Sequence, residues 1–181
     1  MSFKNDVSTK LMRLYRPLEN IMHLDRLDLR ILDCLQNEGG ITNQELANKV
    51  GLSPSASLKR VRRLRERGII ERDVVLLAPE KLGPTLHMVV EVIMERDDKA
   101  LYQRFLKRAL AAPEVKQCYQ VTGEVDFVLI VIVADMERYD LFCDRVLYAD
   151  SNMRKFRTLI SRKRAKFDTR VTLPADESSG Q

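Results

Sequence analysis

The stretch LSPSASLKRVRRLRERGII, residues 52–70, decides the architecture of the first half of this chain. Ser53 followed by Pro54 is typical of a helix start, with serine as the N-cap and proline in the first turn. Gly68 is typical of a helix end, because glycine readily adopts the left-handed conformation found there. Between these signals, six of the nine residues from 59 to 67 are Lys or Arg. The stretch therefore predicts a short helix with a high positive charge.

This helix has two faces. Ser57, Val61 and Leu64 fall on one side of a helical wheel, which predicts contact with a core. The other side and its flanks carry Ser55, Ala56, Lys59, Arg60 and Arg63, while Arg62, Arg65 and Arg67 lie farther along toward phosphate or solvent. Small residues near the start of such a helix allow close approach to base edges in the DNA major groove, and long cations reach phosphates or guanine. The charge alone also fits a helix that only faces solvent. The neighbouring segments therefore have to decide between a DNA-binding helix and a solvated one.

Two segments before this helix complete the pattern of a helix-turn-helix. Apolar residues from 27 to 35 recur at helical spacing, and the pair Gly39-Gly40 ends that helix. Thr42 and Glu45 have the spacing of a capping box, which starts a second helix that ends at Gly51. Residues 69–77, IIERDVVLL, are typical of an extended segment. Three short helices followed by a strand predict a winged helix-turn-helix DNA-binding domain over residues 25–78.

A different periodicity begins after residues 79–84, which we expect to be a linker. The expected strands are residues 85–94, 115–121, 127–133 and 157–167, and the expected helices are residues 98–111 and 136–147. Leu101, Phe105 and Ala109 are expected to share one side of the first of these helices. This β-α-β-β-α-β order predicts a ferredoxin-like domain over residues 85–172. The fold class is therefore α+β, with residues 1–24 as an N-terminal extension of short helices and residues 173–181 as a loose tail.

The strand FVLIVIV, residues 127–133, is apolar at every position, which predicts burial of both its faces. Two helices can cover only one face of a four-stranded sheet. A second copy of the same sheet is the simplest cover for the other face, so we expect a symmetric homodimer. Val128, Ile130 and Ile132, or the residues that alternate with them, are expected to meet the partner.

The distribution of charge along the chain indicates the class of partner. The chain is 45% hydrophobic and 31% charged, which is typical of a folded domain. Residues 53–72 carry a net charge of +5 and residues 154–170 a net charge of +7, although the whole chain carries only +5. Two basic blocks on an acidic remainder predict a polyanionic partner, such as double-stranded DNA.

Other features of the sequence argue against a membrane protein, a metal-binding protein and an enzyme. No apolar run approaches the roughly 20 residues that span a bilayer, and the N-terminus lacks a signal-peptide core, so we expect a cytoplasmic protein with no membrane partner. Three widely spaced cysteines predict reduced thiols rather than a disulfide frame or a metal clip. His23 and His87 are the only histidines, and there is no glycine-rich phosphate loop. We therefore expect no enzymatic activity, no cofactor and no metal site.

The chain resembles the Lrp/AsnC family of transcriptional regulators, also called feast/famine regulators. The resemblance rests on five segments that run from about Leu24 to Pro174: LDRLDLRILDCLQ, ITNQELANKVGLSPSASLKRVRRLRERGII, LLAPEKLG, PEVKQCYQVTGEVDF and KFDTRVTLP. It implies a winged helix-turn-helix, a βαββαβ effector domain, and dimers that often assemble into octamers. It also implies sequence-specific control of amino-acid metabolism genes in response to small effectors, commonly amino acids.

In this family, a turn of the form T-G-D-x-D between the second and third strands lies where dimers meet and takes part in effector binding. The matching residues here are Thr122, Gly123, Glu124, Val125 and Asp126, with Glu124 in place of the more usual Asp and Val125 in place of a frequent aromatic residue. A glycine turn exposes backbone N–H groups that suit a carboxylate, and Asp126 or Glu124 suits an ammonium group. An α-amino acid carries both groups. The residues alone also fit an ordinary hairpin turn.

Two alternatives remain open from the sequence. A sensor or structural oligomer without DNA binding is the rival function, although such a protein would lack residues like 25–75. The run Arg162-Lys163-Arg164 fits a solvated strand end or salt bridges between subunits, and it fits DNA contact if DNA wraps around an octamer.

Overall fold

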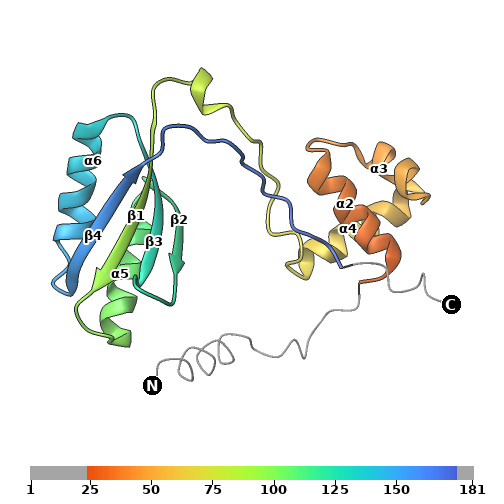
Figure 1. The fold of residues 1–181 in the computed structure, drawn as a ribbon. Coiled ribbons are helices and arrows are strands. Elements are labelled where there is room, and N and C mark those ends of the chain that lie inside the picture. The colour runs from red at the N-terminus through yellow and green to blue at the C-terminus, as the bar shows by residue number, and fades with distance from the viewer. Residues whose placement is uncertain (1–23, 175–181) are drawn as a thin grey trace. The chain divides into compact units, whose positions relative to one another are not determined.

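The computed structural model describes residues 24–174 (Figure 1). Within this range the chain forms two compact units. One unit contains residues 78–166, and the other combines residues 24–77 with residues 167–174. The short helices expected at the N-terminus fall on residues 1–23, which lie outside the described residues.

The unit that begins at residue 24 is built on three helices, α2 (Arg26–Asn37), α3 (Asn43–Val50) and α4 (Pro54–Glu66). α3 starts with the predicted capping box, in which the Thr42 side chain accepts from the backbone N–H of Glu45 and the Glu45 carboxylate accepts from the N–H of Thr42. Ser53 caps α4 as predicted. Gly51 makes the turn between α3 and α4 in the left-handed region, with φ of 73°, and this is a conformation that glycine adopts without strain.

One hydrophobic core holds these three helices together. Its buried side chains are Ile31, Leu32, Leu46, Val50, Val61 and Leu64. Ser57 is also buried, so the predicted inner face of α4 is confirmed. The opposite face of α4 is left for solvent or for a partner.

The second unit has the element order that the sequence predicted. A 3-10 turn (Pro79–Lys81) precedes β1 (Leu86–Met94), α5 (Lys99–Ala111), β2 (Val115–Gln120), β3 (Phe127–Val133), α6 (Met136–Phe142), a π-helical continuation of α6 (Cys143–Tyr148) and β4 (Met153–Ile160). The strands form one antiparallel sheet in the order β2-β3-β1-β4 (Figure 1). This is the ferredoxin-like arrangement, and the α+β class is confirmed.

Both helices of this unit pack on the same face of the sheet. The core on that face contains alternate residues of β1 and β3 together with Tyr102, Phe105 and Ala109 of α5 and Tyr139 and Phe142 of α6. On the other face, Val89 pairs in register with Ile130 on one side and with Leu159 on the other. Three strands therefore share an apolar row that neither helix covers.

The structure departs from the sequence-based expectations in the last strand. β4 ends at Ile160 rather than at Phe167, and the N–H of Ser161 makes a last bond to the carbonyl of His87, at 2.8 Å. The adjacent charges of Arg162-Lys163-Arg164 interrupt the alternation that a half-buried strand requires. Residues 167–174 then join the unit of α2, α3 and α4, although the sequence placed residues up to 172 in the ferredoxin-like domain.

Two smaller differences concern residues 69–77 and α5. The expected extended segment of residues 69–77 forms no strand in the structure, and Val75 is 84% exposed. In α5, Tyr102 is buried together with Phe105 and Ala109. The sequence-based expectation had Leu101 in place of Tyr102. An aromatic ring next to a leucine leaves the helical phase ambiguous by one residue, and the tyrosine ring fits the core.

Candidate DNA-binding surface and effector turn

The N-terminal end of α4 is fixed against α3 and presents small side chains. Asn43 donates from Nδ2 to the carbonyl of Pro54 at 2.9 Å, which ties the two helices at their starts. Ser53 caps the N–H of Ala56 at 3.3 Å and lies 3.2 Å from the hydroxyl of Ser55. Ser55 is exposed and Ala56 is half-buried. Ser53, Ser55 and Ala56 therefore present only small side chains at this end of α4.

Lys59 lies on the open side of α4. Its side chain is exposed, and the part of the chain that the structure describes holds no ion-pair partner for it. An exposed ammonium of this kind is suited to a phosphate contact.

Arg60 and Arg63 lie on the same helix but are held by acidic residues at the start of α2. The Nη1 of Arg60 lies 2.6 Å from Asp25 and 2.9 Å from Asp28. The Nη2 of Arg63 lies 2.6 and 2.8 Å from the two carboxylate oxygens of Asp28. Asp28 is buried, with 1% of its side chain exposed, whereas Arg60 and Arg63 keep 26% and 45% exposed. Within residues 24–174, each guanidinium makes these contacts with one terminal nitrogen, and its other N–H groups make no hydrogen bond.

The same carboxylates cap α2, so the ion pairs and the helix start form one network. Asp25 and Asp28 form a capping box in which the N–H of Asp28 donates to Asp25 at 2.9 Å. Burial tends to raise the pKa of Asp25, but its hydrogen bonds from Arg60 and from the backbone outweigh burial and lower it. Hydrogen bonds to Asp25 and Asp28 raise the pKa of Arg60. Both groups are thus charged at neutral pH.

The role of Asp28 was not predicted from the sequence. Asp25 and Asp28 do have the three-residue spacing of a capping box at a helix start, and the sequence shows that spacing. The burial of Asp28 between two arginines of another helix depends on tertiary contacts, which the sequence does not show.

Farther along α4, Arg62 pairs with Glu66 and Arg65 pairs with Asp73. These side chains are about half exposed or more, and such pairs contribute little to stability.

The turn of residues 121–126 connects β2 to β3. The N–H of Val121 donates to the carbonyl of Asp126 and the N–H of Asp126 donates to the carbonyl of Val92, both at 2.9 Å. Gly123 lies at the tip with φ of 135°, a conformation that favours glycine. The base of the turn is therefore closed by backbone hydrogen bonds and attached to the end of β1.

Asp126 is engaged inside its own domain. One carboxylate oxygen accepts from the N–H of Met94 at 2.7 Å, and the other accepts from the hydroxyl of Tyr102 at 2.5 Å. Burial and then the adjacent carboxylate raise the pKa of Tyr102 well above its ordinary value, so the hydroxyl keeps its proton and donates. Asp126 consequently fixes the turn against β1 and α5.

The tip of the turn is open to solvent. Thr122, Gly123 and Glu124 are exposed, and Val125 is half-buried. Within residues 24–174, the N–H groups of residues 122–125 make no hydrogen bond. The structure brings all five predicted effector residues together, with Asp126 turned inward and Glu124 outward. Tyr102, which positions Asp126, was missed because the wrong phase was expected for α5.

The second basic run lies in a different place. Arg162, Lys163 and Arg164 line a cavity of about 450 Å³ together with His87 and Ser161. His87 lies near the start of β1, where it pairs with Ile132, whereas the turn of residues 121–126 is attached near the end of β1. The basic run and the turn are thus separate features of the sheet domain.

Among the described residues, no group of three His, Cys, Asp or Glu side chains is placed to hold a metal ion. None of the helices in that part of the chain has the length and apolar character that crossing a bilayer requires.

Comparison with known proteins identifies both domains. Residues 24–71 match the winged helix-turn-helix DNA-binding family, and residues 87–171 match the Lrp/AsnC ligand binding domain. The chain is 40% identical to an uncharacterised HTH-type transcriptional regulator of Sinorhizobium fredii over 145 residues, which cover 80% of this chain and 86% of the relative. It is 33% identical to the leucine-responsive regulatory protein of Escherichia coli over 150 residues, with 83% and 92% covered.

A solved structure agrees with these matches. The crystal structure of a transcriptional regulator of Neisseria meningitidis in complex with L-Met has a TM-score of 0.76 and 31% sequence identity, and the match covers 83% of this chain and 97% of that one. These relatives are regulators of transcription and not enzymes. The chain belongs to the Lrp/AsnC family of transcriptional regulators.

Proposed function

We propose that this regulator binds operator DNA as a homodimer through α4, and that an amino acid or a related small molecule bound at the turn of residues 122–126 adjusts that binding. The observation that carries the proposal is the open basic face of α4, held in place by the buried Asp28. Such a protein acts where DNA is, so we place it in the cytoplasm.

In the proposed DNA complex, the start of α4 enters the major groove. Ser55 and Ala56 lie nearest the base edges because they are small, and Lys59 reaches a phosphate or a guanine. Arg60 and Arg63 present their remaining N–H donors to the phosphates that flank the groove. Asp25 and Asp28 hold these two guanidiniums in place before DNA arrives, which lowers the cost of ordering them on binding.

In the proposed effector complex, the open tip supplies the polar groups. The N–H groups of residues 122–125 suit a carboxylate, and the exposed Glu124 suits an ammonium group. Asp126 acts on the shape of the turn rather than on the ligand, because its oxygens already accept from Met94 and Tyr102. Support for an amino acid comes from the L-Met complex of the Neisseria meningitidis relative.

The proposed dimer interface is the open face of the sheet. Val89, Ile130 and Leu159 form its apolar row, and Val128 and Ile132 extend it along β3. A two-fold axis would bring the same face of a second copy onto this row. Higher assemblies, such as the octamers that occur in this family, would then require further contacts.

Two measurements test the proposal. A thermal-shift screen with the twenty amino acids and common 2-oxo acids should reveal a binder, because a ligand that binds the folded state raises the melting temperature. Selection from a random DNA library should recover duplexes with two related half-sites. If no DNA is enriched at moderate salt, the DNA-binding proposal is wrong, and if no compound shifts the melting temperature, the effector class is wrong.

A further inference from the structure

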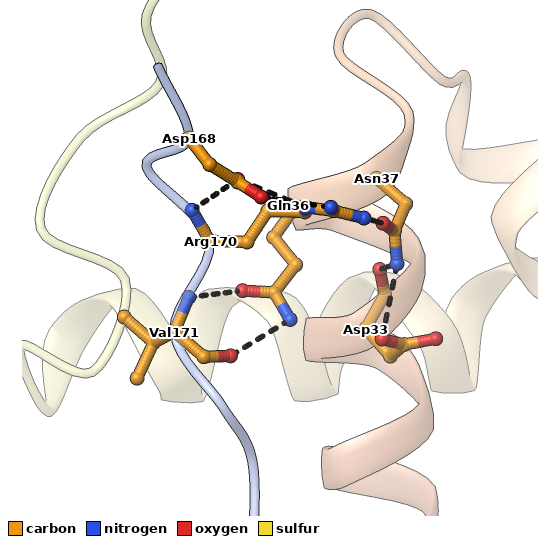
Figure 2. Close-up of polar contacts among 6 residues, drawn as sticks. All are labelled: Asp33, Gln36, Asn37, Asp168, Arg170 and Val171. Carbon is orange, nitrogen blue, oxygen red and sulfur yellow. Dashed lines mark hydrogen bonds and ion pairs between the residues drawn. The ribbon is translucent and has the colours of Figure 1, made fainter. Parts of the chain in front are cut away.

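The segment that follows β4 returns to the DNA-binding domain and pairs with a side chain of α2. Gln36 donates from Nε2 to the carbonyl of Val171 at 3.1 Å and accepts at Oε1 from the N–H of Val171 at 3.0 Å (Figure 2). A primary amide thus satisfies both backbone groups of one residue, as a neighbouring strand does in a ladder. Val171 belongs to no strand of the sheet, so Gln36 takes the place of a strand partner.

A second set of contacts lies one residue earlier. Arg170 donates from Nη1 to the Asn37 side chain at 2.8 Å, and its Nε and Nη2 donate to Asp168 at 3.0 and 2.8 Å. Asn37 in turn donates to the carbonyl and the carboxylate of Asp33 at 2.8 and 3.0 Å (Figure 2). The segment is therefore joined to the last turn of α2 by a continuous polar chain.

Leu173 supplies the apolar part of this contact. Its side chain is half-buried and packs against the core that contains Ile31 and Leu64. The segment of residues 168–173 thus combines a backbone-type pair, a polar chain and one apolar anchor. Three kinds of contact over six residues distinguish a docked segment from a loose tail.

We propose that residues 168–173 act as a latch, which gives the DNA-binding domain a second attachment to the effector domain and restricts its movement. The first attachment is the chain that leaves α4 and enters the sheet domain at Ala78. The second leaves β4 at Ile160 and reaches the latch within eight residues. β4 pairs with β1 from Met88 to Met94, so the sheet holds one end of this short connection and α2 holds the other.

The contacts that hold residues 168–173 on α2 are weak enough for the segment to open and close. Its polar groups are exposed, so water competes for each hydrogen bond and the net contribution of each bond is small. Segments with few buried contacts open locally at low free energy, and such segments provide the moving parts of regulated proteins. With the latch closed, the two DNA-binding domains of a dimer are held near one spacing. With the latch open, each domain moves on a single linker.

The first experiment uses the full-length protein without DNA or effector. Truncation after Lys166 removes the latch, and truncation after Pro174 is the matched control that keeps it. Gln36→Ala removes only the pair with Val171, and Gln103→Ala on the exposed side of α5 is its control. Light scattering checks that the variants share one assembly state, and Gln36→Ala carries the test if truncation alters assembly.

Hydrogen exchange and small-angle X-ray scattering are the measurements in this experiment. The latch predicts faster exchange near the end of α2 and at Val171 in Gln36→Ala, and a broader distance distribution in both latch variants, while exchange in β1 to β4 and in both controls stays as in wild type. Unchanged scattering in both latch variants would overturn the restriction of movement, and unchanged exchange would overturn the docked segment.

The second experiment rests on the proposed function and uses DNA that the wild-type protein selects. Two duplexes are compared, one with both half-sites and one with a single half-site. The latch predicts that Gln36→Ala loses about tenfold in affinity for the double site, because the effective concentration of the second domain falls, and less than about twofold for the single site. Equal losses on both duplexes would show that the segment only stabilises the domain, which contradicts the latch. If the wild type selects no DNA, the proposed function fails, and exchange and scattering still decide on the latch.

Discussion

Arg63 donates from one nitrogen to both carboxylate oxygens of Asp28, and Asp28 is buried where α2 begins. Arg60 binds the same carboxylate from one turn earlier on α4. The positive charge of α4 is therefore only partly available to DNA, because some of it neutralises a buried acid of the same domain. Two arginines that resemble plain DNA contacts in the sequence also hold the helix in position.

Arg63→Ala should lower both stability and DNA binding. Asp28 would keep its ion pair with Arg60, so the loss should be about 1–3 kcal/mol, less than for a fully unpaired buried charge. Urea unfolding of the DNA-binding domain measures this loss. Arg67→Ala, at the C-cap of the same helix, is the control, since Arg67 is exposed, and it should change stability by less than about 0.5 kcal/mol. Equal stability of the two variants would contradict the bracing role of Arg63.

Lys59→Ala should weaken DNA binding without loss of stability, because Lys59 is exposed and has no ion-pair partner among the described residues. If it contacts a phosphate, the slope of log affinity against log salt should fall by about one unit. Anisotropy titrations at several salt concentrations measure the slope. Lys107→Ala on the exposed side of α5 serves as the control and should leave the slope unchanged. Wild-type affinity and slope in Lys59→Ala would remove this residue from the interface.

The sequence predicted the helix-turn-helix closely because its signals are local. The capping box of Thr42 and Glu45, the serine cap of Ser53 and the turn at Gly51 each depend on a few adjacent residues. Asp28 could not be placed in the same way, since its burial depends on arginines more than thirty residues away. The docking of residues 168–173 on α2 depends on contacts across more than 130 residues, which no periodicity records.

The turn of residues 121–126 likewise has features that could be predicted from the sequence and features that could not. The hairpin and the need for Gly123 at its tip were readable from the sequence, because a positive φ favours glycine. The inward orientation of Asp126 was not readable, because it depends on Tyr102 of α5 and on the end of β1. The turn could therefore be predicted from the sequence, but the different orientations of Glu124 and Asp126 could not.

Tyr102→Phe should loosen the effector turn and change the pH dependence of stability. The folded state raises the pKa of Tyr102, so its contribution is fully present below the unfolded value of about 10 and is lost as pH rises toward the higher folded value. Wild-type stability should thus fall above about pH 10, and Tyr102→Phe should show a shallower fall. Denaturant midpoints measured from pH 8 to 11 test this. Identical slopes for both proteins would contradict the raised pKa of Tyr102 in the folded state.

Ile130→Asp should break the proposed dimer. An aspartate in the middle of the apolar row would be buried without a partner in the interface, at a cost of several kcal/mol. Light scattering at micromolar concentration should then report a monomer. Leu110→Asp places the same charge on α5, where Leu110 is 68% exposed, and should stay dimeric. A dimeric Ile130→Asp would show that subunits meet elsewhere.

Gly123→Val should uncouple effector from DNA. A β-branched residue is strained at φ of 135°, so the open tip should change shape while α4 is untouched. The variant should bind selected DNA like wild type and lose the thermal shift with the amino acid found by screening. Asp126→Ala should have the same effect by releasing the turn from Met94 and Tyr102. A wild-type response to effector in both variants would place the sensing site elsewhere.

The most direct test of the account is one DNA titration of the wild-type protein. Selected duplex is titrated with and without the amino acid that gives the largest thermal shift, at one salt concentration. The compound should change DNA affinity by about 5- to 150-fold, which corresponds to the typical coupling free energy between two sites of one protein. Tight DNA binding that is the same with saturating compound as without it would contradict the claim that this protein couples an effector to DNA.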